Sequence, residues 1–326
     1  MTKLLYEAHL ESLRNATDVV DQVLSKTPKS QAPTNTDSAT RETLQHFKKG
    51  YSLLTRFKET EQIQDLDECI PSLEAALAML TPHSPELKRY LVGTALAHSL
   101  RFSRTGKDLD INRAVDLYCR AVELMEDSWD ADEVMALGSA ALTFLHRYDF
   151  LKQLEDVEEA IRLLELVVVR CQGTRDEYRP GYISNLGTAL ARRFRAIGRR
   201  RDLVDAERLC REAVEKSRSS PSGGEHVDLR WNTLMHLSIV LRIKADEFGE
   251  VVDAKDAVKC CEKAIYEAEI VCTKDAKLFH ALGAALLNPF SPALVTLPTF
   301  HGQYRPVMMR LSSRRWTQKD RNSSLA

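Results

Sequence analysis

The sequence contains few of the residues that interrupt regular structure, with only 13 glycines and 11 prolines among 326 residues. Because helices contain fewer of these residues than strands and loops do, long uninterrupted elements are expected. Uncharged apolar runs are missing too: the start, MTKLLYEAHLESLRNATDVV, does not fit a signal peptide, and no later stretch approaches a membrane span. The seven cysteines include no CxxC pair. These absences predict a cytoplasmic protein with reduced, mostly buried thiols.

Motifs that carry catalysis or bind cofactors are also absent. The chain has no GxGxxG or GxxxxGK[ST] phosphate loop, no HExxH, and no pair of histidines at metal-ligand spacing among its nine. A cysteine–histidine dyad can form through space, but Cys69, Cys210 and Cys261 occupy packing positions of the repeat described below. The sequence therefore predicts a protein that is not an enzyme and holds neither a cofactor nor a metal.

Net charge gives no preference for a polyanionic partner. Lys+Arg 46 against Asp+Glu 47 leaves −1, so each basic segment has to be judged locally. The densest is RRFRAIGRRRDL, residues 192–203, with six arginines in ten positions. It allows a nucleic-acid or nuclear-import interpretation. Because acids follow at once and Glu155, Asp156, Glu158 and Glu159 form the corresponding turn one copy earlier, we favour charge pairing between neighbouring copies or a solvated edge.

The chain repeats itself with a period of about 46 residues. The first mark is an arginine followed by an aromatic or, in the last copy, an aliphatic residue; these arginines are Arg56, Arg101, Arg147, Arg193 and Arg242. The second is an aspartate eight residues after each of the first four aromatics and ten after Ile243: Asp65, Asp110, Asp156, Asp202 and Asp253. Each copy is predicted to contain two helices, and the aspartate is predicted to cap the second through its carboxylate.

The second helix of each copy carries small or compact residues at fixed offsets. Four residues after the aspartate are Cys69, Ala114, Ala160, Ala206 and Ala257, and seven further on are Ala76, Ala121, Val167, Ala213 and Ala264. Between them lie Leu73, Tyr118, Leu164, Cys210 and Cys261. Compact residues two turns apart let a neighbouring helix approach closely, so these positions are predicted to face the core.

This spacing, with Leu186-Gly187 on the first helix, resembles the tetratricopeptide repeat, or TPR. The unit here is longer than the usual one of about 34 residues, by nearly two helical turns on the first helix. LGTALARRFRAIGRRRDLVDAERLCREAV is most similar to the elongated TPR-like units of filamentous-fungal proteins, which often precede a caspase-like CHAT domain. The resemblance covers residues 41–287, and no such domain fits after residue 287.

The predicted fold is all-α: a right-handed α-solenoid of about five stacked antiparallel helix pairs plus a partial sixth, over residues 41–287. Residues 1–24 are predicted to form an N-terminal helix and residues 25–40 a flexible linker. Residues 288–326, rich in proline and arginine, are predicted to form an irregular basic tail that is either disordered or a loosely docked coil. The unpaired sixth helix leaves an apolar edge that could mediate oligomerisation.

The predicted function is a non-catalytic scaffold that binds a protein or peptide in a groove lined by the first helices. No membrane partner is expected. One alternative is a nucleic-acid-associated or nuclear protein that uses residues 192–201 and the basic tail; another is an accessory component of a caspase-like protease system. The candidate contacts are Arg56, Arg101, Arg147, Arg193 and Arg242, which either form a ladder in the groove or point toward the turns as structural residues.

Overall fold

The computed structural model describes residues 38–84, 86–125, 131–171, 178–218 and 227–270. The predicted N-terminal helix 1–24, the partial sixth helix pair and the tail 288–326 lie outside these residues. The predicted linker 25–40 also lies outside them, except for its last three residues, which begin a helix at Ser38.

Ten α-helices account for the regular structure of the described residues, and these contain no strand. The all-α fold of consecutive helix pairs is therefore confirmed. The helices are α2 (Ser38–Thr60), α3 (Ile63–Ala78), α4 (Leu87–Thr105), α5 (Asp108–Glu123), α6 (Ala131–Leu151), α7 (Leu154–Arg170), α8 (Arg179–Ile197), α9 (Arg200–Arg218), α10 (Val227–Phe248) and α11 (Val251–Ile270).

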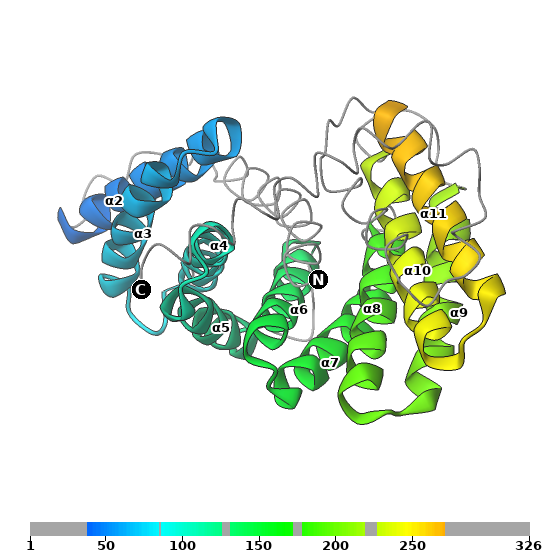
Figure 1. Cartoon of the computed structure of the whole chain (residues 1–326). Helices are drawn as coiled ribbons and strands as arrows, with labels where there is room; N and C mark the ends of the chain where they lie inside the picture. The colour runs from blue at the N-terminus through cyan, green and yellow to red at the C-terminus, as the bar shows by residue number, and fades with distance from the viewer. Residues whose placement is uncertain (1–37, 85, 126–130, 172–177, 219–226, 271–326) are drawn as a thin grey trace, which may run out of the picture. The chain divides into compact units, whose positions relative to one another are not determined.

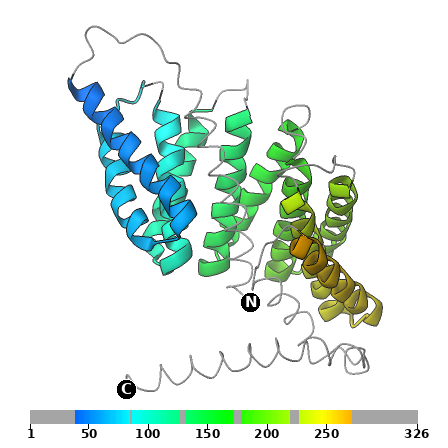
Figure 2. The same cartoon turned by 90° about the horizontal axis from the view of Figure 1, so that it is seen from above.

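The helices group into two compact units, and the chain divides between Tyr182 and Ile183 within α8. In the N-terminal unit each helix from α2 to α6 packs on the next, and α4 also contacts α2 and α6. Figure 1 shows α4 and α6 on one side of this unit and α5 and α7 on the other, and Figure 2 shows the pairs side by side. In the C-terminal unit α10 packs on both α9 and α11. Layered helix pairs in each unit are the arrangement of a repeat stack.

Every described pair turns from its first to its second helix through the same backbone geometry. One residue has a left-handed φ of 55–71°, and its N–H bonds the carbonyl four residues earlier at 2.7–2.9 Å. This closes the first helix in the manner of an αL C-cap. The five residues are Glu61, Gly106, Lys152, Gly198 and Gly249.

Replacing Gly106 with alanine tests the cost of this turn without adding a clash, because a Cβ there would meet no atom within 4 Å. We expect Gly106→Ala to lower the free energy of unfolding by about 1 kcal/mol through backbone strain alone. Lys152→Gly, at the same turn position of another pair, should change stability in the opposite direction. Urea unfolding of both variants checks this, and a stabilising Gly106→Ala would contradict it.

The small positions of the second helices form the core as the sequence predicts. All fifteen residues at the three offsets are 0–2% exposed. Opposite them, a first helix comes close to the second helix of its pair at Gly50 and Gly187. A Cβ on Gly187 would lie 2.5 Å from Sγ of Cys210 and 3.0 Å from the carbonyl oxygen of Ala206. Glycine at this position therefore allows the two helices of a pair to touch.

Candidate functional site

The arginines singled out in the sequence point toward the turns and bind the aspartates. Arg56 donates to Asp65 at 2.5–2.8 Å, and Arg101 donates to Asp110 at 2.6–2.9 Å through two nitrogens. Arg147 and Arg193 make the equivalent bonds to Asp156 and Asp202 at 2.6–3.1 Å. Each arginine precedes its aspartate by nine residues, so the left-handed turn brings the end of one helix against the start of the next.

In the fifth pair the structure corrects the predicted register. Arg242 does not bind Asp253; it pairs with Asp246 on its own helix at 3.2 Å. Lys244, nine residues before Asp253, binds that carboxylate at 3.2–3.3 Å. The left-handed residue Gly249 also lies five residues after Lys244, as in the other four pairs. The extra residues of this copy therefore lie before Lys244, and the turn from Lys244 to Asp253 has the same length as in the other four pairs.

In α3, α5 and α7 the aspartate is not the helix cap, which differs from the sequence interpretation. The cap positions of α3, α5 and α7 are Gln62, Lys107 and Gln153, none of which makes a side-chain capping bond. Each aspartate is the third residue of its helix. The backbone N–H of four of them donates to the carbonyl of the residue just before the helix; these four are Asp65, Asp110, Asp156 and Asp202. The carboxylates instead face the preceding helix. They still lie in the first turn, where negative charge suits the helix dipole.

These ion pairs are largely withdrawn from solvent. Asp110, Asp156 and Asp202 are 1–4% exposed at the side chain, and their arginines 16–20%. Arg56, in the first described pair, is 54% exposed. Burial raises the pKa of the Asp110 carboxyl, but the bonds from Arg101 and His98 outweigh it, so its pKa lies below the ordinary value. Because these arginines are bonded to aspartates of the same chain, a structural role at the turns fits them better than a role as a row of contacts for a peptide.

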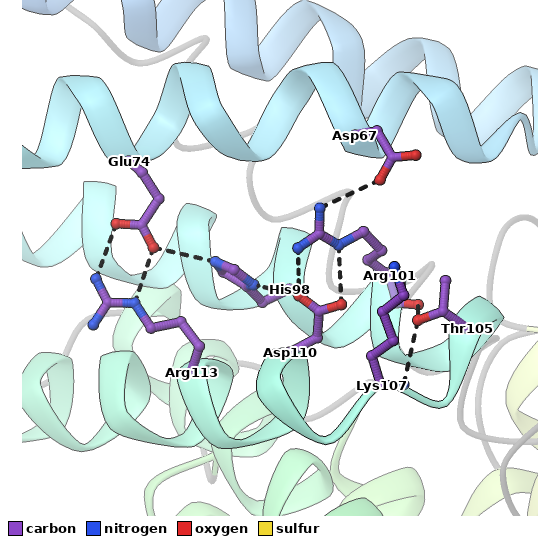
Figure 3. Close-up of polar contacts among 8 residues, drawn as sticks. All are labelled: Asp67, Glu74, His98, Arg101, Thr105, Lys107, Asp110 and Arg113. Carbon is purple, nitrogen blue, oxygen red and sulfur yellow. Dashed lines mark hydrogen bonds and ion pairs between the residues drawn. The ribbon is translucent and has the colours of Figure 1, made fainter.

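A charged network joins the first two pairs of the N-terminal unit (Figure 3). The ring of His98 lies between two carboxylates, with Nδ1 2.8 Å from Asp110 and Nε2 3.2 Å from Glu74. Glu74, on α3, accepts two bonds of 2.9 Å from Arg113 of α5. Arg101 reaches back from α4 to Asp67 of α3 at 3.3 Å. The network therefore binds α3 of one pair to both helices of the next.

The network predicts a pH dependence that can be assigned to Glu74. The bond from His98, then those from Arg113, lower the pKa of the Glu74 carboxyl from 4.5 to about 2 against the opposing effect of burial. A lowered pKa stabilises the fold above pH 4.5, and this contribution is lost as the pH falls toward 2. We expect Glu74→Gln to be less stable than wild type at neutral pH, and the difference to shrink in acid. Urea unfolding of both proteins from neutral pH into acid measures it; a constant difference would contradict it.

The arginine-rich segment divides into buried and exposed parts. Arg192 is 6% exposed and donates to the carbonyl of Thr188 at 3.3 Å, and Arg193 is bonded to Asp202. Arg199, Arg200 and Arg201 are exposed at the turn into α9. Two of the six arginines thus serve the fold, which weakens the nucleic-acid interpretation. The predicted pairing with the acidic turn of the preceding copy would join the two units and stays a prediction.

The buried thiols and the serine–histidine contact have structural surroundings. Burial raises the pKa of Cys69 to about 12 and that of Cys261 to about 11, so both hold their protons at neutral pH. His236 Nδ1 lies 2.8 Å from Oγ of Ser184, but both side chains are buried, and burial lowers the pKa of His236 to about 3. Neither arrangement presents a reactive atom to solvent.

Within the part of the chain that the structure describes, no group of three or more histidine, cysteine, aspartate or glutamate side chains is placed to hold a metal ion. Among these same residues, no helix has the length and apolar character needed to cross a bilayer.

Comparison with solved structures identifies the architecture. A variant of a kinesin-light-chain-like protein of Podosopora anserina, with nearly identical TPR-like repeats, is 17% identical; the match covers 73% of this chain and 99% of that one, with a TM-score of 0.50. The chain has a TPR-like fold. The parent protein of that variant matches at 16% identity over 73% of this chain and 100% of its own, with a TM-score of 0.49. BtubC (BKLC) of P. vanneervenii matches at 12% over 74% and 94%, with a TM-score of 0.46.

Family models and characterised proteins give no match. The similarity to CHAT-associated units therefore rests on the sequence alone, whereas the TPR-like architecture rests on both sequence and structure.

Proposed function

We propose that this protein is a non-catalytic TPR-like scaffold that binds a protein partner along its first helices. The main observation behind the proposal is an ion pair that joins the two helices of every described pair. An arginine or lysine at the end of each first helix binds the aspartate nine residues later in all five pairs. Such pairs hold each helix in a set orientation, which pre-forms a surface and lowers the entropic cost of binding.

The arginine–aspartate ion pairs also limit which side chains can contact a partner. The arginine ridge is engaged with carboxylates of this chain, so binding an acidic peptide there would have to break these pairs. The first helices offer other side chains, as α2 does with the exposed Lys48 and the half-exposed Thr55. A protein segment that lies across successive first helices is the ligand class that suits a stacked repeat.

Site-specific photo-crosslinking tests this proposal. A photoreactive phenylalanine at Lys48 on first helix α2 is compared with one at the exposed Arg120 on second helix α5. Proteins captured in an extract are identified by mass spectrometry, and binding is then repeated with both partners purified. We expect one saturable partner, crosslinked from position 48 and not from position 120. Capture of a cysteine protease would place the chain in a caspase-like system.

Two results would overturn the proposal. One is the absence of any partner that binds the purified full chain at saturable sites. The other is crosslinking from position 120 alone, which would move the binding surface to the second helices. Unfolding curves matching wild type for both labelled proteins serve as the control for correct folding.

A further inference from the structure

Five large apolar side chains are exposed at two neighbouring turns of the C-terminal unit. Ile197 is the last residue of α8, and Val204 lies near the start of α9. The other three, Phe248, Val251 and Val252, lie where α10 ends and α11 begins. We call these residues the turn patch: Ile197, Val204, Phe248, Val251 and Val252, which are 42–69% exposed. Exposed apolar groups gathered in this way mark a binding surface more often than isolated ones do.

The two turns lie against each other. The guanidinium carbon of Arg200 is 5.8 Å from the centre of the Phe248 ring, and Lys244 on α10 bonds Glu207 of α9 at 3.0 Å. Val204 lies between Arg200 and Glu207 on the same stripe of α9, so it faces this junction. Phe248 and Val204 therefore lie at the junction of the two turns, and Ile197, Val251 and Val252 belong to the same two turns.

The surroundings of the turn patch are basic. Arg199 and Arg201 make only long contacts, 3.9 Å to Asp202 and 3.6 Å to Asp205, with side chains 56% and 83% exposed. Such exposed pairs leave most of the positive charge available to a ligand. Arg195, Arg199, Arg200 and Arg201 are exposed, against the exposed Asp246, Glu247 and Glu250, so four positive charges stand against three negative ones. The overall neutrality of the chain hides this local excess.

We infer that the turn patch is a peripheral membrane-binding site for an anionic lipid surface. Exposed apolar tips supply partial insertion and the arginines supply attraction to negative headgroups, the two signals that together hold a protein on a bilayer. The small size of the patch favours this occupant, since a standard protein interface needs about 20–30 residues a side. The exposure of all five side chains also differs from the concave, enclosed sites that bind small molecules.

Sedimentation with sucrose-loaded vesicles tests the inference on the full chain. Vesicles of phosphatidylcholine alone are compared with vesicles containing about 30% phosphatidylserine. We expect binding to the anionic vesicles that weakens as salt is raised. Phe248→Ser with Val252→Ser, and separately Arg199→Gln with Arg201→Gln, should each weaken it about tenfold.

Leu109→Ser is the matched control, because Leu109 is 78% exposed beside an equivalent turn of the N-terminal unit that lacks the arginine cluster. It should leave binding unchanged, and the basic residues near the C-terminus are the same in every variant. The inference fails if anionic vesicles do not sediment the protein, if Leu109→Ser weakens binding as much, or if only the arginine variant matters. It also fails if the Phe248/Val252 variant loses a protein partner while vesicle binding is kept. The crosslinking experiment above can succeed or fail independently.

Discussion

Replacing Arg101 with methionine is expected to lower the free energy of unfolding of the N-terminal unit by about 3 kcal/mol. The substitution keeps the length and apolar stem of the side chain but removes the charge that neutralises Asp110. That carboxylate is 1% exposed. Asp110 would keep only its contact with His98 at 2.8 Å. A buried carboxylate that loses its guanidinium partner bears the desolvation cost with most of the compensating attraction gone, so the expected effect exceeds that of an ordinary surface ion pair.

Two further variants separate this explanation from a simple loss of packing. Arg101→Lys keeps the charge but gives up the two-nitrogen contact, so its effect should be intermediate; the natural Lys244–Asp253 pair has longer bonds of 3.2–3.3 Å. Arg56→Met breaks the equivalent pair where the arginine is 54% exposed, and its effect should be clearly smaller. Urea unfolding monitored by circular dichroism gives the order. Equal effects of Arg56→Met and Arg101→Met would show that burial of the pair does not matter.

Gly50→Ala is expected to destabilise the same unit by about 2 kcal/mol, although alanine is the better helix former. A Cβ on Gly50 would lie 2.6 Å from two carbons of Leu73, which is buried at 2% exposure and cannot move aside without disturbing the core. Gly50 occupies the same repeat position as Gly187, where the close approach includes the backbone of the second helix. Chemical unfolding of the variant measures the loss.

Gly93→Ala provides the control with the opposite sign. Gly93 also lies within a first helix of the N-terminal unit, but the nearest atom to its Cβ would be a ring carbon of Phe47 at 3.8 Å, an ordinary contact. The substitution should therefore stabilise the unit by about 0.5–1 kcal/mol through helix propensity. If Gly50→Ala and Gly93→Ala shift the unfolding midpoint in the same direction, the expected clash between a Cβ at position 50 and Leu73 does not determine stability.

The helix pairs could be predicted because their determinants are local. Small residues at fixed offsets on the second helices mark a face that one neighbour must approach, and Ala114, Ala160 and Ala206 are all fully buried. The orientation of the arginines was left open by the sequence, since a side chain near a helix end can reach carbonyls, solvent or the next helix. The turn patch was not anticipated, because its residues come from two copies that adjoin only in space.

The left-handed turn residue shows why the site could be predicted only in part. Glycine in three turns suggests a positive φ, but Glu61 and Lys152 adopt the same conformation without that signal. Once the five turns are aligned on this residue, Lys244 takes the place assigned to Arg242 in the sequence. A register based on residue identity fails where a lysine substitutes for an arginine, whereas backbone geometry is the same in every copy.

By itself, the sequence determined that this protein consists of repeated helix pairs with compact residues at their contacts, because helical periodicity and side-chain volume act over a few residues. Only the tertiary structure decided which groups the aspartates bind, that the fifth copy uses Lys244, and that apolar and basic side chains meet at the turn patch. The physical reason is distance. Charge pairing and surface formation depend on separations of a few ångströms between residues from different helices, and these are established only when the pairs pack.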